Sequence, residues 1–437
     1  MSKRTKLQTA VELVKDVVIL LLMCSAVWML AQGGLSRLLA GRDMTRTSSG
    51  QSTISDRTEF VSPVRMTATL RSLPESQRCS IQYDIGTVDM LFQQTAGLLV
   101  EALSSAEQPR QISRTQWEQA LGCAPGLCFD FMEEMPLSVL SGWMDTQLSL
   151  PDVTVSRIVL AGEEDQTRLY YCDMETGGWY RCDTAIVGTT QLENALSGLS
   201  ANGAFYAFET EWAEIMDPDT LLRPVVEPMQ VFTASNPVSG GRTALEQIMS
   251  DLGFQLSGCL FYSGAGEEVG RSGSDTLRLS KDGVVEYHTD EGSAVQFPVM
   301  VQPGCSEAFS AAEACANLLR QAMNERCGQA RVHLARMEKR AEGWDVEFEY
   351  SLNGVPVSGG EHAAARFEVR GGFVTAFSIR LRNYVQSEMH HYLLPPEQAA
   401  AAMDALCLEG EELYVTYRDM GEESVFPNWT AGAPRVG

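Results

Sequence analysis

Two adjacent histidines near the C-terminal end are the residues whose types first suggest chemistry. His390 and His391 follow Glu388 in the stretch EMHHYLL. Imidazole and carboxylate groups bind zinc and serve as general acids and bases. Neighbouring side chains on a strand point to opposite faces, so only Glu388 and His390 would share a face. Since no third ligand is identifiable, the pattern favours a strand followed by a helix over a metal site.

The other titratable residues form no cluster with catalytic spacing. We expect His288 and His333 on the solvent side of strands, His362 in a loop, and the pairs 133–134 and 422–423 as surface glutamates. The chain has no G-x-S-x-G, H-E-x-x-H or Walker motif, and its glycine-rich stretches fit loops. The sequence therefore predicts a protein that is not an enzyme and has no cofactor or metal.

The eleven cysteines raise the question of a disulfide. Cys172 and Cys182 flank the hairpin-like stretch DMETGGWYR. A three-residue loop at 176–178 would place them opposite each other, whereas a two-residue loop at 177–178 would put them on opposite faces. A Cys172–Cys182 disulfide and free buried thiols both stay open. There is no C-x-x-C motif and no Cys/His cluster with zinc spacing.

The charge balance limits the classes of partner. Asp and Glu number 57 against 33 Lys and Arg, which gives a formal net charge of -24. Nucleic-acid binding requires a basic surface, and no basic block offsets this excess. We therefore expect no nucleic acid as partner.

An apolar stretch near the N-terminus predicts a membrane anchor. Residues 17–36 contain no charged side chain, and a helix of this length would span about 30 Å of bilayer. Basic residues at 3, 4, 6 and 15 precede it, which favours a cytoplasmic tail and an exported remainder. The stretch is long for a signal peptide and lacks a good Ala-x-Ala cleavage site. We expect an uncleaved single span.

One stripe of this span carries polar groups. Leu21, Ser25, Trp28 and Gln32 follow helical spacing, so they would lie on one side of the helix. Polar side chains within a span can hydrogen-bond to a neighbouring helix. The stripe therefore predicts contact with a partner helix. The alternative is that Gln32 lies among the headgroups and Trp28 anchors the helix at the interface.

The remaining chain reads as α+β, with antiparallel sheets and packed helices. The divisions we expect are a tail (1–16), the transmembrane helix (17–36), a Ser/Thr-rich spacer (37–60), an N-terminal extracytoplasmic domain (61–235), a middle unit (236–305) and a C-terminal domain (306–437). Residues 64–70 alternate as a half-buried strand. Capping-box spacing predicts helices that begin near Thr243 and near Ser310.

Two hairpins can be specified further from residue parity. A three-residue loop at 281–283 would place Leu277 opposite Tyr287. In the stretch 365–381 the apolar inward residues are all odd-numbered on both sides of Gly371-Gly372. A two-residue loop pairs odd positions with even ones, so we expect a three-residue or bulged loop there.

The C-terminal third resembles a known family. The stretches VEFEYSLNGVPV, ARFEVRGGFVTAFSIRLRNY, LLPPEQAAAAMDAL and VFPNW are similar to those of the YycH/YycI proteins. The final unit looks more like YycI, while the length and the extra N-terminal region look more like YycH. These are membrane-anchored auxiliary regulators of the WalK (YycG) sensor histidine kinase in low-GC Gram-positive bacteria.

The resemblance implies a regulator with no catalysis. Its expected partners are a sensor histidine kinase and a related auxiliary membrane protein, contacted through membrane helix and exported domain. One alternative is a tethered extracytoplasmic module that binds a wall polymer or a protein, for example a protease inhibitor. Another is an envelope hydrolase with an unrecognised site, which would require a pocket of clustered ionisable groups.

Overall fold

The computed structural model describes residues 60–71, 77–238, 241–264, 266–290, 296–359, 363–421 and 423–433. They belong to one compact unit that spans Thr53–Gly437. Their antiparallel sheets and packed helices make an α+β fold, as the sequence patterns predict. No helix in these ranges is long and apolar enough to cross a bilayer, and the predicted span at 17–36 lies outside them.

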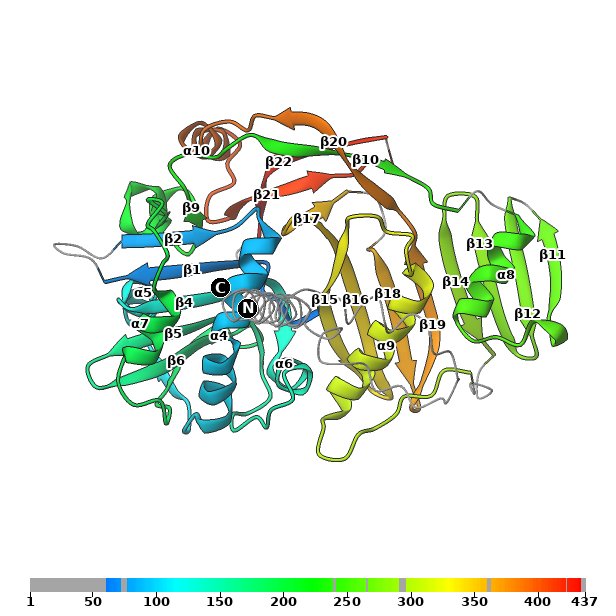
Figure 1. Cartoon of the computed structure of the whole chain (residues 1–437), viewed down its shortest axis with the longest axis horizontal. Helices are drawn as coiled ribbons and strands as arrows, with labels where there is room; N and C mark the ends of the chain where they lie inside the picture. The colour runs from blue at the N-terminus through cyan, green and yellow to red at the C-terminus, as the bar shows by residue number, and fades with distance from the viewer. Residues whose placement is uncertain are drawn as a thin grey trace, which may run out of the picture. The chain divides into compact units, whose positions relative to one another are not determined.

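A seven-stranded antiparallel sheet forms the first part of the fold (Figure 1). Its strands are β1 (Arg65–Leu70), β2 (Gln77–Ile81), β3 (Arg110–Ile112), β4 (Gly126–Pro136), β5 (Thr154–Glu163), β6 (Gln166–Asp173) and β7 (Gly178–Cys182). They lie in the order β2-β1-β4-β5-β6-β7-β3. The helices are α4 (Ile85–Ser105), α5 (Arg114–Gly122), α6 (Leu137–Trp143) and α7 (Thr190–Leu196).

Both faces of this sheet are buried. Phe129 and Leu160 pack on one side with α4, α6 and α7, whereas Cys128 and Val159 pack on the other side with α5. The second side also carries β8 (Phe205–Tyr206) and β9 (Leu221–Leu222). Our prediction of a half-buried strand at 64–70 is therefore wrong for β1. Its polar positions are also buried because a second layer covers them.

A thirteen-stranded sheet makes up the rest of the fold. Its strands are β10 (Met229–Ser235), β11 (Leu260–Gly264), β12 (Glu267–Ser272), β13 (Asp275–Ser280), β14 (Val284–Thr289), β15 (Arg331–Arg340), β16 (Gly343–Leu352), β17 (Val355–Ser358), β18 (Ala365–Arg370), β19 (Phe373–Arg380), β20 (Asn383–His391), β21 (Glu412–Arg418) and β22 (Ser424–Gly432). The order is β11-β12-β13-β14-β19-β18-β16-β17-β21-β22-β10-β20, with β15 beside β16. Helix α8 (Arg242–Asp251) packs on β12 and β13, α9 (Glu307–Met323) packs on β16, β18 and β19, and α10 (Pro396–Ala405) follows β20.

Strand pairs in this sheet cross the predicted divisions after residues 235 and 305. Strand β10 pairs with β20 and β22, and β14 pairs with β19. The divisions themselves stay predictions. Three short 3-10 segments complete the described elements, at Ala207–Glu209, Glu211–Glu214 and Leu256–Gly258.

Both hairpin predictions are confirmed by the register. Leu277 lies opposite Tyr287. Between β18 and β19, Phe367 faces Phe377, and a register shift at 368–369 restores the odd pairing across the tight Gly371-Gly372 turn. Both glycines have positive φ, which residues with a Cβ rarely adopt.

The two predicted capping boxes are wrong. Helix α8 begins after Gly241 with no side-chain cap. Helix α9 begins one turn earlier than expected, where the Ser306 hydroxyl accepts a hydrogen bond from the Phe309 amide at 3.0 Å. Glu313 instead accepts a hydrogen bond from the Trp143 indole at 2.8 Å. The spacing of Ser310 and Glu313 fits a capping box, but the Glu313 carboxylate is hydrogen-bonded to the Trp143 indole instead.

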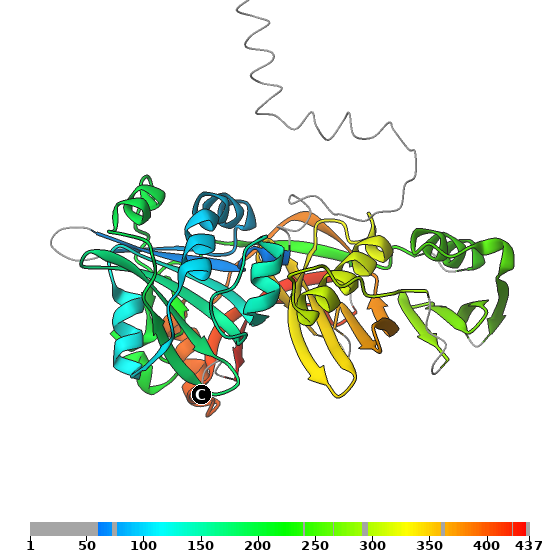
Figure 2. The ribbon, with the colours of Figure 1, turned by 90° about the horizontal axis from the view of Figure 1, so that it is seen from below.

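This contact lies where the two sheets meet. Helix α6 packs against α9 (Figures 1 and 2). Trp143 is the last residue of α6. Phe60 stacks on Trp143 at 5.8 Å between ring centroids, and Arg331 of β15 pairs with Asp89 of α4 at 2.6 Å. Apolar packing and buried polar contacts thus join the sheets.

Candidate functional site

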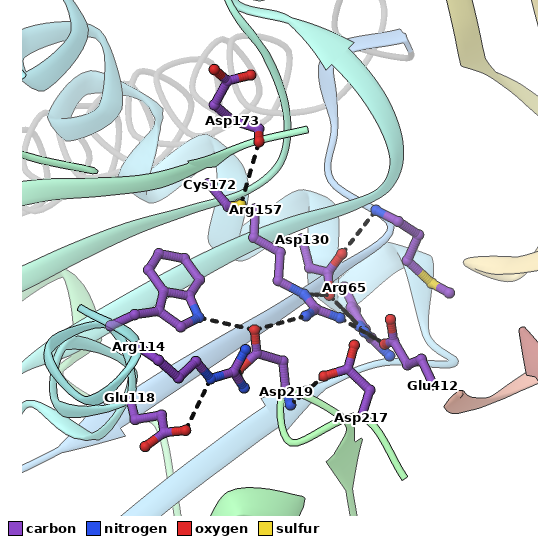
Figure 3. A network of polar contacts seen from close by, with 12 residues as sticks. Arg65, Arg114, Glu118, Asp130, Arg157, Cys172, Asp173, Asp217, Asp219 and Glu412 are labelled. Carbon is purple, nitrogen blue, oxygen red and sulfur yellow. Dashed lines mark hydrogen bonds and ion pairs between the residues drawn. The ribbon is translucent and has the colours of Figure 1, made fainter. Parts of the chain in front are cut away.

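Charged side chains gather in the interior on the second face of the seven-stranded sheet (Figure 3). Arg65, Asp130 and Arg157 come from β1, β4 and β5, and each is at most 4% exposed. The register dictates their proximity, since Arg65 lies opposite Asp130 and Asp130 lies opposite Arg157. Asp219 and Glu412, both fully buried, reach this row from other segments.

Two arginines share two carboxylates at the centre of this network. Arg65 Nε and Arg157 Nε both donate to Asp130 Oδ2, at 2.7 and 2.9 Å. Their Nη2 atoms donate to Glu412 Oε1, at 2.5 and 2.6 Å. Glu412 begins β21 of the thirteen-stranded sheet, so the network is a second joint between the two sheets.

Asp219 links the layer that covers the sheet to the row of Arg65, Asp130 and Arg157. Its carboxylate accepts from the Trp117 indole at 2.9 Å and from Arg114 Nη2 at 2.7 Å, and lies 3.7 Å from Arg157. Asp217 Oδ1 accepts from the Asp219 amide at 2.8 Å, while its Oδ2 is buried without a hydrogen-bond partner. The loop at 217–219 is thereby fixed between α5 and β5.

Burial and neighbouring charges set the protonation of these groups. Burial lowers the pKa of Arg157, but Asp130 and Glu412 more than offset this, so that the pKa lies well above its usual value. Burial raises the pKa of Asp217 to about 6 against the opposing effect of Arg157, and burial also raises the pKa of Asp219. The arginines stay charged, and Asp217 takes up a proton in mildly acidic solution.

This arrangement is suited to holding elements together rather than to turnover. The guanidinium and carboxylate groups are engaged with each other and closed off from solvent. A catalytic acid–base pair requires access to a substrate. The network therefore positions β21 and the 217–219 loop against the sheet.

The histidines singled out by the sequence do not meet. Glu388, His390 and His391 are exposed on β20, with the helix α10 starting at Pro396, so the strand-to-helix interpretation is confirmed. His288 is exposed as expected, but His333 is 7% exposed, and its predicted solvent position is wrong. Strand β15 packs against β4, which covers the face that we expected to be open. Within the described ranges no three His, Cys, Asp or Glu side chains could hold a metal ion.

The cysteine hairpin has a longer loop than either alternative that we considered. Asp173 lies opposite Gly178, Cys172 opposite Trp179, and Cys182 opposite Leu169. Cys172 and Cys182 therefore point to opposite faces of the sheet, and both are free and fully buried. Of the glutamate pairs, Glu133 and Glu134 are half-buried and Glu423 is exposed. The stripe Leu21, Ser25, Trp28 and Gln32 lies outside the described residues.

The sequence carried a signal for the buried network that we did not use. Asp130 and Arg157 are single charges within the short, mainly apolar runs LCFDFM and SRIVLAG. A lone charge in such a run is costly unless it is paired in the interior. The partner Glu412 could not be inferred in this way, because it lies 255 positions from Arg157 along the chain.

Comparison with known proteins gives one informative result. No family model matches the chain, and no curated protein matches it. The solved structure of YycH from Bacillus subtilis matches 90% of this chain and 98% of its own, with a TM-score of 0.54 and 9% sequence identity. The resemblance to YycH expected from the sequence is thus confirmed for the fold. The chain has the YycH fold.

Proposed function

We propose that the chain is a non-enzymatic, single-pass membrane regulator of a cell-envelope sensor histidine kinase of the WalK type. The likeness in fold to YycH, which extends over nearly the whole of that chain, is the observation that carries the proposal. The apolar stretch at 17–36 supports a membrane anchor with a cytoplasmic N-terminus.

In this proposal the protein acts by contact. Its membrane helix lies against helices of the kinase or of a related auxiliary protein, and its extracytoplasmic part binds the same partners outside the membrane. The joint through Glu412 and the α6–α9 contact favour an extracytoplasmic part that transmits contacts as one body. Such a regulator requires no catalytic site of its own.

Capture from solubilised membranes tests the proposal. Full-length protein is affinity-purified from its own cells in mild detergent, and the recovered proteins are identified by mass spectrometry. A variant in which 17–36 is replaced by an unrelated apolar span is the matched control. We expect a histidine kinase with the native span and much less with the replacement. Equal recovery would favour a tethered binding module, and no kinase with either span would refute the proposal.

Crosslinking tests the stripe on the membrane helix separately. A photoreactive residue at position 25 lies on the stripe of Leu21, Ser25, Trp28 and Gln32, whereas one at position 22 lies off it. We expect partner capture from position 25 and little from position 22. Equal capture from both positions would show that the stripe is not the contact.

A further inference from the structure

A pocket of ≈ 340 Å³ opens at the junction of the two sheets. Gln82 and Tyr83 line it from the loop between β2 and α4. Arg223 and Glu227 come from the segment before β10, and Gln386 and His390 from β20. The volume lies at the small end of the range for ligand pockets.

Arg223 supplies a cation that forms no ion pair in this pocket. Its side chain is half-buried, its Nε is buried without a hydrogen-bond partner, and it has no ion pair with any described carboxylate. Arg223 and Tyr83 line the same pocket. Burial raises the pKa of the Tyr83 hydroxyl to about 12, and the positive charges of Arg65 and Arg223 oppose this rise. A guanidinium in such a place suits a carboxylate, which it can bind through two parallel hydrogen bonds.

Gln82 supplies an acceptor that lacks a donor. It is 5% exposed, and its Oε1 is buried without a hydrogen-bond partner. Buried polar atoms nearly always have a partner, so an N–H group from a ligand would complete this one. In proteins and peptides, the backbone amide is the commonest group of this kind.

The loop that carries Gln82 is fixed from the other sheet. Tyr83 has a positive φ of 67°, and its carbonyl accepts a hydrogen bond from Asn353 Nδ2 at 2.8 Å. Asn353 Oδ1 accepts in turn from the Ile85 amide at 3.2 Å. The backbone that carries Gln82 is therefore fixed before any ligand arrives, which reduces the entropic cost of binding.

The opposite side of the pocket offers further polar groups. Gln386 and His390 are four positions apart on β20 and share a face. Glu227 is exposed at the rim and provides a carboxylate that can pair with an ammonium group. Asp84 also lines the pocket, but its carboxylate already caps α4 through Thr87. One cation, one free carboxylate and several amides match a zwitterion with peptide groups.

We propose that this pocket binds a short peptide with free termini, recognised through its main chain. Arg223 binds the α-carboxylate, Gln82 accepts a hydrogen bond from a peptide N–H, and Glu227 binds the α-ammonium group. Gln386 and His390 contribute hydrogen bonds from β20. The proposal does not depend on the regulation of a kinase. If both proposals hold, the bound peptide contacts both sheets at once and affects the joint between them.

Calorimetric titration of the full-length protein in detergent micelles tests this site. The probes are the tripeptide Ala-Ala-Ala, the same tripeptide with a C-terminal amide, and inorganic phosphate. We expect the free acid to bind about 10-fold or more tightly than the amide, because the charged contact to Arg223 is lost. Equal binding of acid and amide, equal binding of phosphate, or no binding of the free acid would overturn the proposal.

Variants locate the binding to the pocket. Arg223→Gln should weaken the free acid about 10-fold or more, whereas Arg418→Gln, an exposed arginine on β21 next to the pocket residue Tyr417, should leave it unchanged. Gln82→Leu should weaken binding while the urea midpoint stays the same or rises, since the variant removes an unsatisfied buried atom. Equal loss in Arg418→Gln, or full binding in Arg223→Gln, would contradict the assignment. These outcomes do not involve the kinase, so they test the pocket independently of the proposed function.

Discussion

The two sheets differ in whether their charged residues are buried or exposed. In the seven-stranded sheet, Arg65 and Arg157 lie in the interior, at most 3% exposed, and share two buried carboxylates. In the thirteen-stranded sheet, Arg366 pairs with Glu347 at 3.1 Å on a surface where the arginine side chain is 56% exposed. The first sheet has a second layer over its polar face, and this part of the second sheet does not.

Alternation of polar and apolar residues therefore does not by itself identify the face that is exposed to solvent. Both sheets have strands in which polar and apolar residues alternate. A covered polar face requires that every charge be paired, because an unpaired buried charge is costly. An open face has no such requirement, and its ion pairs contribute little.

The largest expected effect is from removal of a shared arginine. Arg157→Ala leaves Asp130, Asp219 and Glu412 short of a counter-charge in the interior, so we expect a loss of about 3–5 kcal/mol in the free energy of unfolding. Arg366→Ala is the matched change on the open face and should cost at most about 1 kcal/mol. Urea unfolding measures both. Similar losses in the two variants would contradict the expected difference between buried and exposed arginines in the two sheets.

A smaller effect concerns the dependence of stability on pH. The folded pKa of Asp217, about 6, lies above the unfolded value of about 3.9, so the folded state binds more protons between these values. The contribution of Asp217 to the free energy of unfolding therefore increases as the pH falls from about 7 to 4. Asp217→Asn should be more stable than the native protein at pH 7, by about 1–3 kcal/mol, and equally stable near pH 4.

The comparison with Asp217→Asn is needed because a second group contributes in the same direction. Burial raises the pKa of Glu349 to about 7, so it also favours the folded state at lower pH. The difference between the variant and the native protein isolates Asp217. A difference that does not change between pH 4 and 7 would show that Asp217 is not protonated on folding.

Hydrogen bonds from two tryptophan indoles give a third comparison of buried and exposed contacts in the two sheets. Trp117→Phe leaves the buried Asp219 without one hydrogen bond, so we expect a loss of about 1–3 kcal/mol. Trp429→Phe removes a hydrogen bond to the Leu394 carbonyl at 2.9 Å from a half-exposed side chain and should cost less than about 1 kcal/mol. Thermal or urea unfolding measures both, and a larger loss for Trp429→Phe would reverse the expected order.

The smallest expected effect is that of reduction. Cys172 and Cys182 lie on opposite faces, so a reductant should leave the midpoint of unfolding unchanged. Thiol labelling of the unfolded protein without reductant should modify both residues. A labelled mass that shows this pair protected would mean that the register between β6 and β7 differs from the one described.

Local patterns predicted local structure well. The parity of Phe367 and Phe377 was enough to predict an irregularity near Gly371-Gly372, because strand register is a local property. The spacing of Leu277 and Tyr287 predicted their pairing for the same reason. The start of α9 was misplaced by one turn because Ser306 and Ser310 are both suitable caps, and tertiary contacts of Glu313 decide between them.

The site residues were harder to predict because they depend on contacts between distant segments. The polar positions of the strand at 64–70 were expected on an open face, and only the layer that carries Asp219 makes Arg65 an interior residue. His333 was misplaced since β15 packs against β4. In the pocket, Gln82 and Gln386 lie about 300 positions apart in sequence, and the ordinary composition of both segments gave no sign of their meeting.

Kinase activity in reconstituted vesicles tests the central proposal most directly. The cognate sensor kinase is incorporated alone, with the full-length protein, or with the variant whose span 17–36 is replaced, and autophosphorylation is measured. We expect the full-length protein to change the rate about 5-fold or more, in a direction that the fold does not fix, and the replacement to lose this effect. An unchanged rate at a saturating ratio of the two proteins would contradict it.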